Sequence, residues 1–159
     1  MLQKSEMCIS LPFEGCWEIG KGDVDSVQFI DLLIETFPEA TTVYIEGTSI
    51  ESDVKTVFEE FTQNGPYLPK NQTLWPKSEC YRCVFSKEFL KKLSYLAQNH
   101  ADPELLDHLF IYRNETPLME WPDAFFSYIW ISTEITESRA KAFAGELELS
   151  WKYVKDELT

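Results

Sequence analysis

Two cysteines lie three residues apart, at Cys80 and Cys83, and they are the strongest chemical signal in the sequence. A Cys-x-x-Cys pair can bind zinc or alternate between dithiol and disulfide. This pair lies in a run typical of a strand, where residues three apart point to opposite faces. A zinc knuckle would need a turn there, and a redox pair would open a helix. We therefore expect structural thiols, with no metal, no cofactor and no disulfide.

The other residues suited to catalysis form no recognisable pattern. With only two histidines, His100 and His108, no convincing Ser-His-Asp, HExxH or Cys-His-Asn arrangement can be built. The stretch Gly20-Lys21-Gly22-Asp23 is placed where a phosphate-binding turn would be, between a strand and a helix. It lacks both the GxxxxGK[ST] and the GxGxxG pattern. We assign no catalytic residue.

An enzyme or a small-molecule-binding protein is nevertheless the alternative function. Ligands of open α/β sheets bind beyond the carboxyl ends of the parallel strands. The side chains expected there are Lys21, Glu46, Thr48 and Ser86, with Arg113 if its strand ends on the same side. Lys21 or Arg113 would hold an anion, and Glu46 would act as a general base.

The elements that would position these residues alternate along the chain. Strands are predicted at 16–19, 41–45, 81–85, 108–113 and 125–131. One helix is predicted from a cap at Asp23 or Asp25 to residue 37, and a second from a capping box of Thr48 and Glu51 to a stop at Asn64-Gly65. Further helices are predicted at 86–97, from 102, and over a long C-terminal stretch from 133 to 154. This βα-βα-βα-α-β-β-α order predicts an α/β fold, or α+β as the alternative, with a mixed sheet of about five strands covered by helices. The last two strands are expected to be antiparallel, because too few residues join them for a helical crossover. No linker divides the chain, so residues 1–159 are predicted to form a single domain.

The net charge of −13 is unevenly distributed. Only three of the 14 basic residues, Lys4, Lys21 and Lys55, fall within residues 1–65. So acidic a chain repels nucleic acids and anionic membranes. It also has no apolar run long enough to span a bilayer and no basic and apolar signal at its N-terminus. We expect a cytoplasmic location.

The first two predicted helices concentrate the acidic residues. Those expected to form a partner-binding face are Asp23, Asp25, Asp31, Glu35, Glu39, Glu59 and Glu60. Helices that follow successive parallel strands can lie on one side of a sheet, where their carboxylates would combine into one surface. Two loops with a Trp-Pro step, at Trp75 and Trp121, either cover the core or supply an apolar contact beside that surface.

In size, acidity and lack of catalytic motifs the chain is similar to bacterial immunity and inhibitor proteins, which cap a basic toxin. This resemblance of type implies a non-catalytic role. The sequence therefore predicts an acidic interaction protein for a basic partner protein, with solubility as the alternative explanation of the charge. It predicts no oligomeric state.

Overall fold

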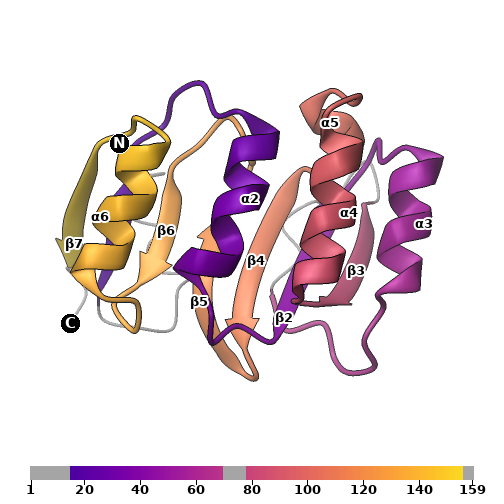
Figure 1. The fold of residues 1–159 in the computed structure, drawn as a ribbon. Coiled ribbons are helices and arrows are strands. Elements are labelled where there is room, and N and C mark those ends of the chain that lie inside the picture. The colour runs from indigo at the N-terminus through magenta and orange to yellow at the C-terminus, as the bar shows by residue number, and fades with distance from the viewer. Residues whose placement is uncertain (1–14, 70–77, 156–159) are drawn as a thin grey trace.

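A computed structural model describes residues 15–69 and 78–155, which form one sheet with helices packed against it (Figure 1). The strands are β1 (Gly15–Ile19), β2 (Thr42–Gly47), β3 (Glu79–Val84), β4 (His108–Arg113), β5 (Thr116–Trp121), β6 (Ile129–Ser132) and β7 (Trp151–Lys155). The helices are α2 (Ser26–Thr36), α3 (Ser52–Glu60), α4 (Lys87–Ala97), α5 (Asp102–Leu105) and α6 (Glu137–Glu146). No helix in these ranges is long and apolar enough to cross a membrane.

The sheet has the strand order β3-β2-β4-β5-β6-β1-β7, and every neighbouring pair is antiparallel. The predicted mixed sheet of about five strands is therefore wrong in strand number and in direction. The expected antiparallel pairing of the last two predicted strands is also wrong. β5 lies between β4 and β6 and is antiparallel to both, so β4 and β6 are not neighbours and run in the same direction.

The connections explain the absence of parallel pairs. The α2 crossover leads from β1 to β2, but β4, β5 and β6 lie between these two strands in the sheet. After α3, residues 61–63 run beside β3, with backbone bonds from Gln63 N to Arg82 O (2.8 Å) and from Val84 N to Phe61 O (2.9 Å). The chain then enters β3 from the end of the sheet where β2 stops, so β3 runs antiparallel to β2.

Two strands were missed for local reasons. β5 contains Pro117 and precedes Pro122, and the β4–β5 register shifts next to Pro117, so its sequence resembles a loop. β7 was assigned to a long C-terminal helix because Trp151 and Val154 continue the helical spacing. α6 in fact ends at Glu146, and Glu148 adopts a left-handed backbone (φ 56°) that turns the chain into β7.

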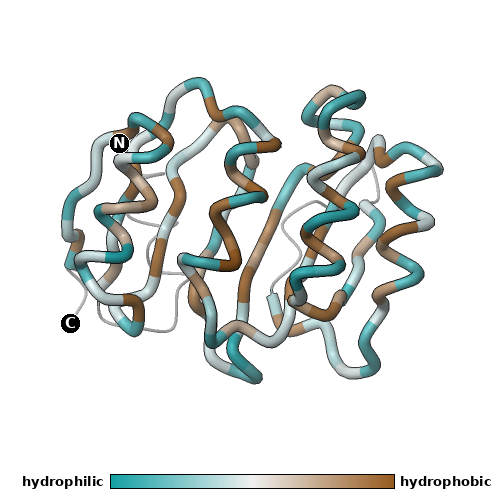
Figure 2. The backbone as a smooth tube through the Cα atoms, viewed as in Figure 1, coloured by the Kyte–Doolittle hydropathy of each residue, from teal (hydrophilic) through white to brown (hydrophobic). Residues whose placement is uncertain are grey.

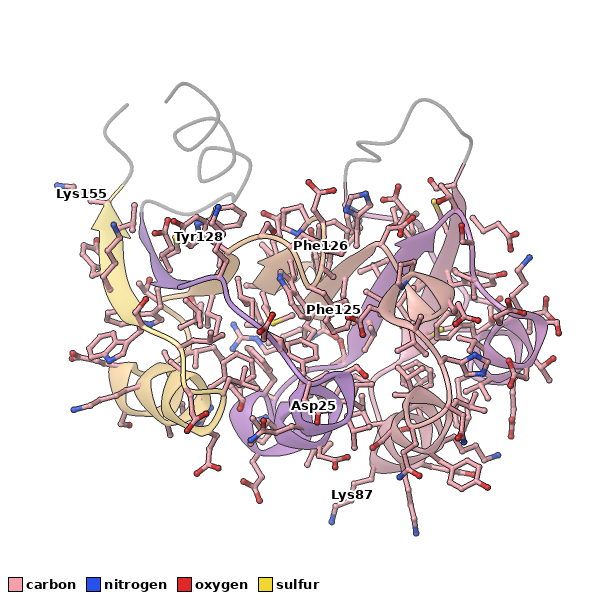
Figure 3. All side chains as sticks on the ribbon, turned by 90° about the horizontal axis from the view of Figure 1, so that it is seen from above. Asp25, Lys87, Phe125, Phe126, Tyr128 and Lys155 are labelled. Atoms are coloured by element: carbon pink, nitrogen blue, oxygen red, sulfur yellow. The ribbon has the colours of Figure 1, made fainter. Side chains whose placement is uncertain are left out.

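All the helices lie on one face of the sheet (Figure 3). Hydrophobic residues recur along each of the longer helices (Figure 2), and their buried members pack against the sheet. The core between the layers contains fully buried Leu33, Phe58, Leu93, Trp121 and Phe143. Across the sheet the helices follow the order α6, α2, α4, α3 (Figure 1). α4 therefore separates α2 from α3.

The opposite face of the sheet carries polar and aromatic side chains. One cross-strand row contains Arg82, Tyr44, Phe110, Glu120, Trp130, Glu18 and Lys152. Glu18 is buried in this row, where its carboxylate accepts a bond from Trp130 Nε1 (3.3 Å) and lies 3.6 Å from Lys152 Nζ. A carboxylate is tolerated at such a depth because it has both a donor and a counter-charge.

Candidate functional site at the acidic edge

Acidic side chains gather where β2 and β5 end, at the upper edge of the sheet in Figure 1. Four segments meet there: 20–25, 48–53, 98–107 and 122–128. Their acidic residues are Asp23, Asp25, Glu51, Asp53, Asp102, Glu104, Asp107 and Asp123, and their basic residues are Lys21 and His100. We call this surface the acidic edge.

Backbone hydrogen bonds fix three of these segments relative to one another. Glu51 N donates to Glu104 O (3.0 Å), and Asp107 N donates to Glu46 O (2.7 Å). Ala124 N in turn donates to Asp107 O (2.7 Å). Because these are main-chain bonds, the spacing of the segments does not depend on the charge of their side chains.

His100 neutralises part of the acidic edge. Its Nε2 lies 2.9 Å from Asp53 Oδ2 and its Nδ1 lies 3.6 Å from Glu104 Oε2. The hydrogen bond to Asp53 raises the pKa of His100 and lowers that of Asp53. Burial, together with the charge of Asp25, raises the pKa of Asp102, so these two carboxylates lie close enough to repel each other.

The segment 122–128 turns sharply. Asp123 (φ 48°) and Phe125 (φ 74°) both adopt left-handed backbone conformations, which are costly for a bulky residue. The ring of Phe125 packs against that of Trp121, with 4.7 Å between the ring centroids. Trp121 Nε1 in turn donates to Ser127 O (3.2 Å). Phe126 points the other way and is 74% exposed. In Figure 3, which looks down on this edge, Phe125 lies on the side of Asp25 and Phe126 lies beyond it.

Beside Phe126 the surface is hollowed into a cavity of about 210 Å³, which we call the edge pocket. Its apolar lining residues are Pro103, Leu106, Ala124 and Phe126, and its polar ones are Thr48, Asp107, His108 and Asp123. Phe126 is one of only three large hydrophobic residues that are well exposed in the described ranges; the others are Tyr95 and Tyr153. Tyr95 also lines a pocket, of about 320 Å³, but that pocket contains Lys87 and Lys91 beside its one carboxylate, Asp31. The described residues that line the edge pocket include two carboxylates and no lysine or arginine.

The polar side chains of the edge pocket have defined orientations. Asp107 Oδ2 accepts bonds from both the amide and the hydroxyl of Thr48, each at 2.9 Å. His108 Nδ1 accepts a bond from Asp123 N (2.9 Å). Among the residues that the structure describes, neither Asp107 nor Asp123 pairs with a Lys or Arg side chain.

The acidic residues predicted for a partner surface are divided between different parts of the molecule. Asp23 and Asp25 belong to the acidic edge, where Asp25 caps α2. Asp31 accepts a bond from Ser94 Oγ on α4 (2.7 Å), and Glu35 and Glu59 are exposed on their helices. Ion pairs hold Glu39 to Arg139 (3.0 Å) and Glu60 to Lys92 (2.6 Å). The assumption that α2 and α3 are neighbours was wrong, because α4 with its lysines lies between them.

The residues of the predicted ligand site are not brought together. Lys21, Glu46 and Thr48 lie toward the acidic edge, but Ser86 and Arg113 lie at the opposite edge, because β3 and β4 run the other way. Ser86 caps α4, and Arg113 pairs with Glu134 (3.5 Å). Glu46, expected to act as a base, is fully buried and accepts bonds from Ser78 Oγ (2.9 Å) and Tyr67 OH (3.2 Å).

The exposed aromatic residue described at this edge is neither of the two tryptophans predicted from their Trp-Pro steps. Trp121 is fully buried and contacts Phe29 at 4.3 Å between ring centroids, so it is part of the core. Trp75 lies outside the described residues. The exposed residue is Phe126, which was not predicted, although the consecutive Phe125 and Phe126 indicated that one of the two rings would be exposed. Adjacent side chains rarely point into the same core.

The cysteines of β3 occupy opposite faces, as predicted. Cys83 is fully buried with its Sγ 3.5 Å from Phe58 O, and burial raises its pKa to about 12. Cys80 is exposed. The ranges 15–69 and 78–155 contain no group of three or more residues that could hold a metal ion.

Comparison of the chain with models of protein families, with curated proteins and with solved structures finds no match.

Proposed function

We propose that this protein is a non-catalytic interaction protein that binds a basic partner protein through the acidic edge. The observation that carries the proposal is Phe126, which is 74% exposed beside the carboxylates of Asp107 and Asp123. Aromatic residues are enriched at protein interfaces, where a few anchors that become buried carry most of the binding energy. The surrounding negative charge favours a cationic partner and speeds its association.

The rigidity of the acidic edge supports the same function. The backbone bonds from Glu51, Asp107 and Ala124 hold the segments in place before any partner binds. A surface that is already ordered loses little conformational entropy on association. The strained turn at Phe125 also holds Phe126 outward. Such a backbone conformation destabilises the fold by about 1–3 kcal/mol, and strain of this size is concentrated at functional sites.

The proposal is tested by capture of proteins from the source cells on the immobilised chain at about 50 and 150 mM salt. We expect a basic protein to be recovered in stoichiometric amount, less at the higher salt. Recovery should be lost with Phe126→Ala and with Asp123→Lys.

Two control variants make this result specific. Tyr95→Ala removes another well exposed ring, from α4, and Glu115→Lys makes the same charge change at the opposite edge of the sheet. Both should leave recovery intact. Recovery that depends on Glu115 as strongly as on Asp123 would mean that only the overall charge matters, and the proposal would then be wrong.

A further inference from the structure

We infer that the edge pocket binds the side chain of an arginine of the partner, in preference to lysine. This inference rests on the proposed function, because it specifies which group of the basic partner enters the pocket. It follows from the shape of the pocket, its polar groups and the ring of Phe126.

The size and lining of the pocket suit a long side chain with a polar end. A cavity of about 210 Å³ is too small for most cofactors but large enough for one side chain. Pro103, Leu106 and Ala124 provide an apolar wall for the methylene groups of such a side chain. The polar end would then lie beside Phe126 and the carboxylates.

The polar groups of the pocket select a cation with several donors. Both N–H and O–H of Thr48 bind the same oxygen of Asp107, which leaves the other oxygen as an acceptor. Asp123 is a second acceptor, and its side chain is 66% exposed. A guanidinium group has five N–H donors in one plane and can bond to two carboxylates at once.

The Phe126 ring favours guanidinium over ammonium. A guanidinium is flat and weakly hydrated, so it can stack on an aromatic ring while its edge makes hydrogen bonds. An ammonium is compact and strongly hydrated, and it would lose more hydration beside the ring. A hard metal ion is a poorer ligand still, because it prefers six or more oxygen ligands and an aromatic wall supplies none.

His108 holds one wall of the edge pocket in place. Its Nδ1 accepts a bond from the amide of Asp123, and this bond also fixes the start of the 122–128 turn. The described residues that line the pocket thus offer two carboxylates to an entering guanidinium and include no lysine or arginine.

The test compares two blocked peptides of equal length and charge, Ac-Lys-Gly-Lys-Arg-Lys-Gly-Lys-NH₂ and the same peptide with lysine in place of arginine. Binding to the full chain is measured by calorimetry at about 20 mM salt. We expect the arginine peptide to bind about five- to tenfold more tightly. In ¹H–¹⁵N spectra, the amides of Thr48 and Asp123 should shift most, because both line the pocket.

Variants then locate the preference. Phe126→Ala and Asp123→Asn should each make the two affinities equal, whereas Tyr95→Ala should preserve the difference. The same ¹H–¹⁵N spectra verify that each variant is folded. A preference for arginine that persists in Phe126→Ala would overturn the inference.

The outcomes also separate the inference from the proposed function. If both peptides bind equally and both are weakened by Asp123→Asn, arginine selection is wrong but the acidic edge still binds basic partners. If neither peptide binds, or if both bind with shifts away from Thr48 and Asp123, the pocket is no docking site and both conclusions fail.

Discussion

Because Phe125 has a left-handed backbone conformation, we predict that glycine at this position gives a more stable protein than alanine. Phe125→Ala and Phe125→Gly both remove the ring that packs on Trp121, so the lost packing is nearly the same in the two variants. They differ in the φ of 74°, which costs an alanine about 1–2 kcal/mol and a glycine almost nothing. Glycine also makes the unfolded chain more flexible, which costs about 0.4–1 kcal/mol. The glycine variant should therefore be the more stable by about 0.5–1 kcal/mol.

Urea unfolding followed by circular dichroism measures this difference from the midpoints, provided that the m values agree. Ala142→Gly is the matched control, because Ala142 is exposed in the middle of α6, where glycine should cost about 0.5–1 kcal/mol. The two sites should thus show opposite signs for the same exchange of alanine and glycine. A Phe125→Ala variant as stable as Phe125→Gly would refute the strained turn, and with it the explanation of how Phe126 is presented.

Three further predictions concern individual side chains. The pKa of His100 is raised and that of Asp53 is lowered, so their pair stabilises the fold fully between about pH 4 and pH 6.5, the pKa values of the two groups in the unfolded chain. This stabilisation is lost as pH rises through the folded pKa of His100 or falls through that of Asp53. His100→Asn should therefore lower the melting temperature more at pH 6 than at pH 9. Glu46→Leu removes the carboxylate that accepts bonds from the Ser78 and Tyr67 hydroxyls and should cost about 1–3 kcal/mol in urea unfolding, more than Glu46→Gln does. Iodoacetamide at pH 8 should label Cys80 in the folded protein but Cys83 only after unfolding, because burial raises the pKa of Cys83 to about 12; equal labelling rates would contradict the buried position.

The sequence predicted most of the individual elements, because their signals are local. Asp25, one of the two caps considered for α2, and Ser86, the cap expected for α4, cap these helices, and β2 and β4 were recognised from their β-branched and aromatic residues. The cap expected at Thr48 is wrong, because α3 begins after Glu51 and the Thr48 hydroxyl donates to Asp107 instead. The sheet topology was not predicted, because alternation of strands and helices does not determine which strands become neighbours. The insertion of β4, β5 and β6 between β1 and β2 depends on contacts far apart in the chain.

The candidate site was only partly predictable for the same reason. Asp23 and Asp25 were identified from their charge, but Asp107, His108 and Phe126 become neighbours only through the antiparallel meander. Trp121 attracted attention as a large aromatic residue next to a proline. In the fold this residue is buried, and the exposed ring belongs to Phe126, five residues later.

The distribution of charge in space differs from its distribution along the chain, and this difference bears on the function. Acidic residues of α3 and of the turn after α2 meet basic residues of the second half of the chain, as Glu60 meets Lys92 and Glu39 meets Arg139. Exposed pairs of this kind contribute little stability, but they cancel charge locally. At the acidic edge, by contrast, carboxylates from both halves of the chain come together and His100 neutralises only some of them. Uncompensated charge on a surface fixed by backbone bonds, next to an exposed ring, is more readily explained by a cationic partner than by solubility, since solubility requires no particular arrangement.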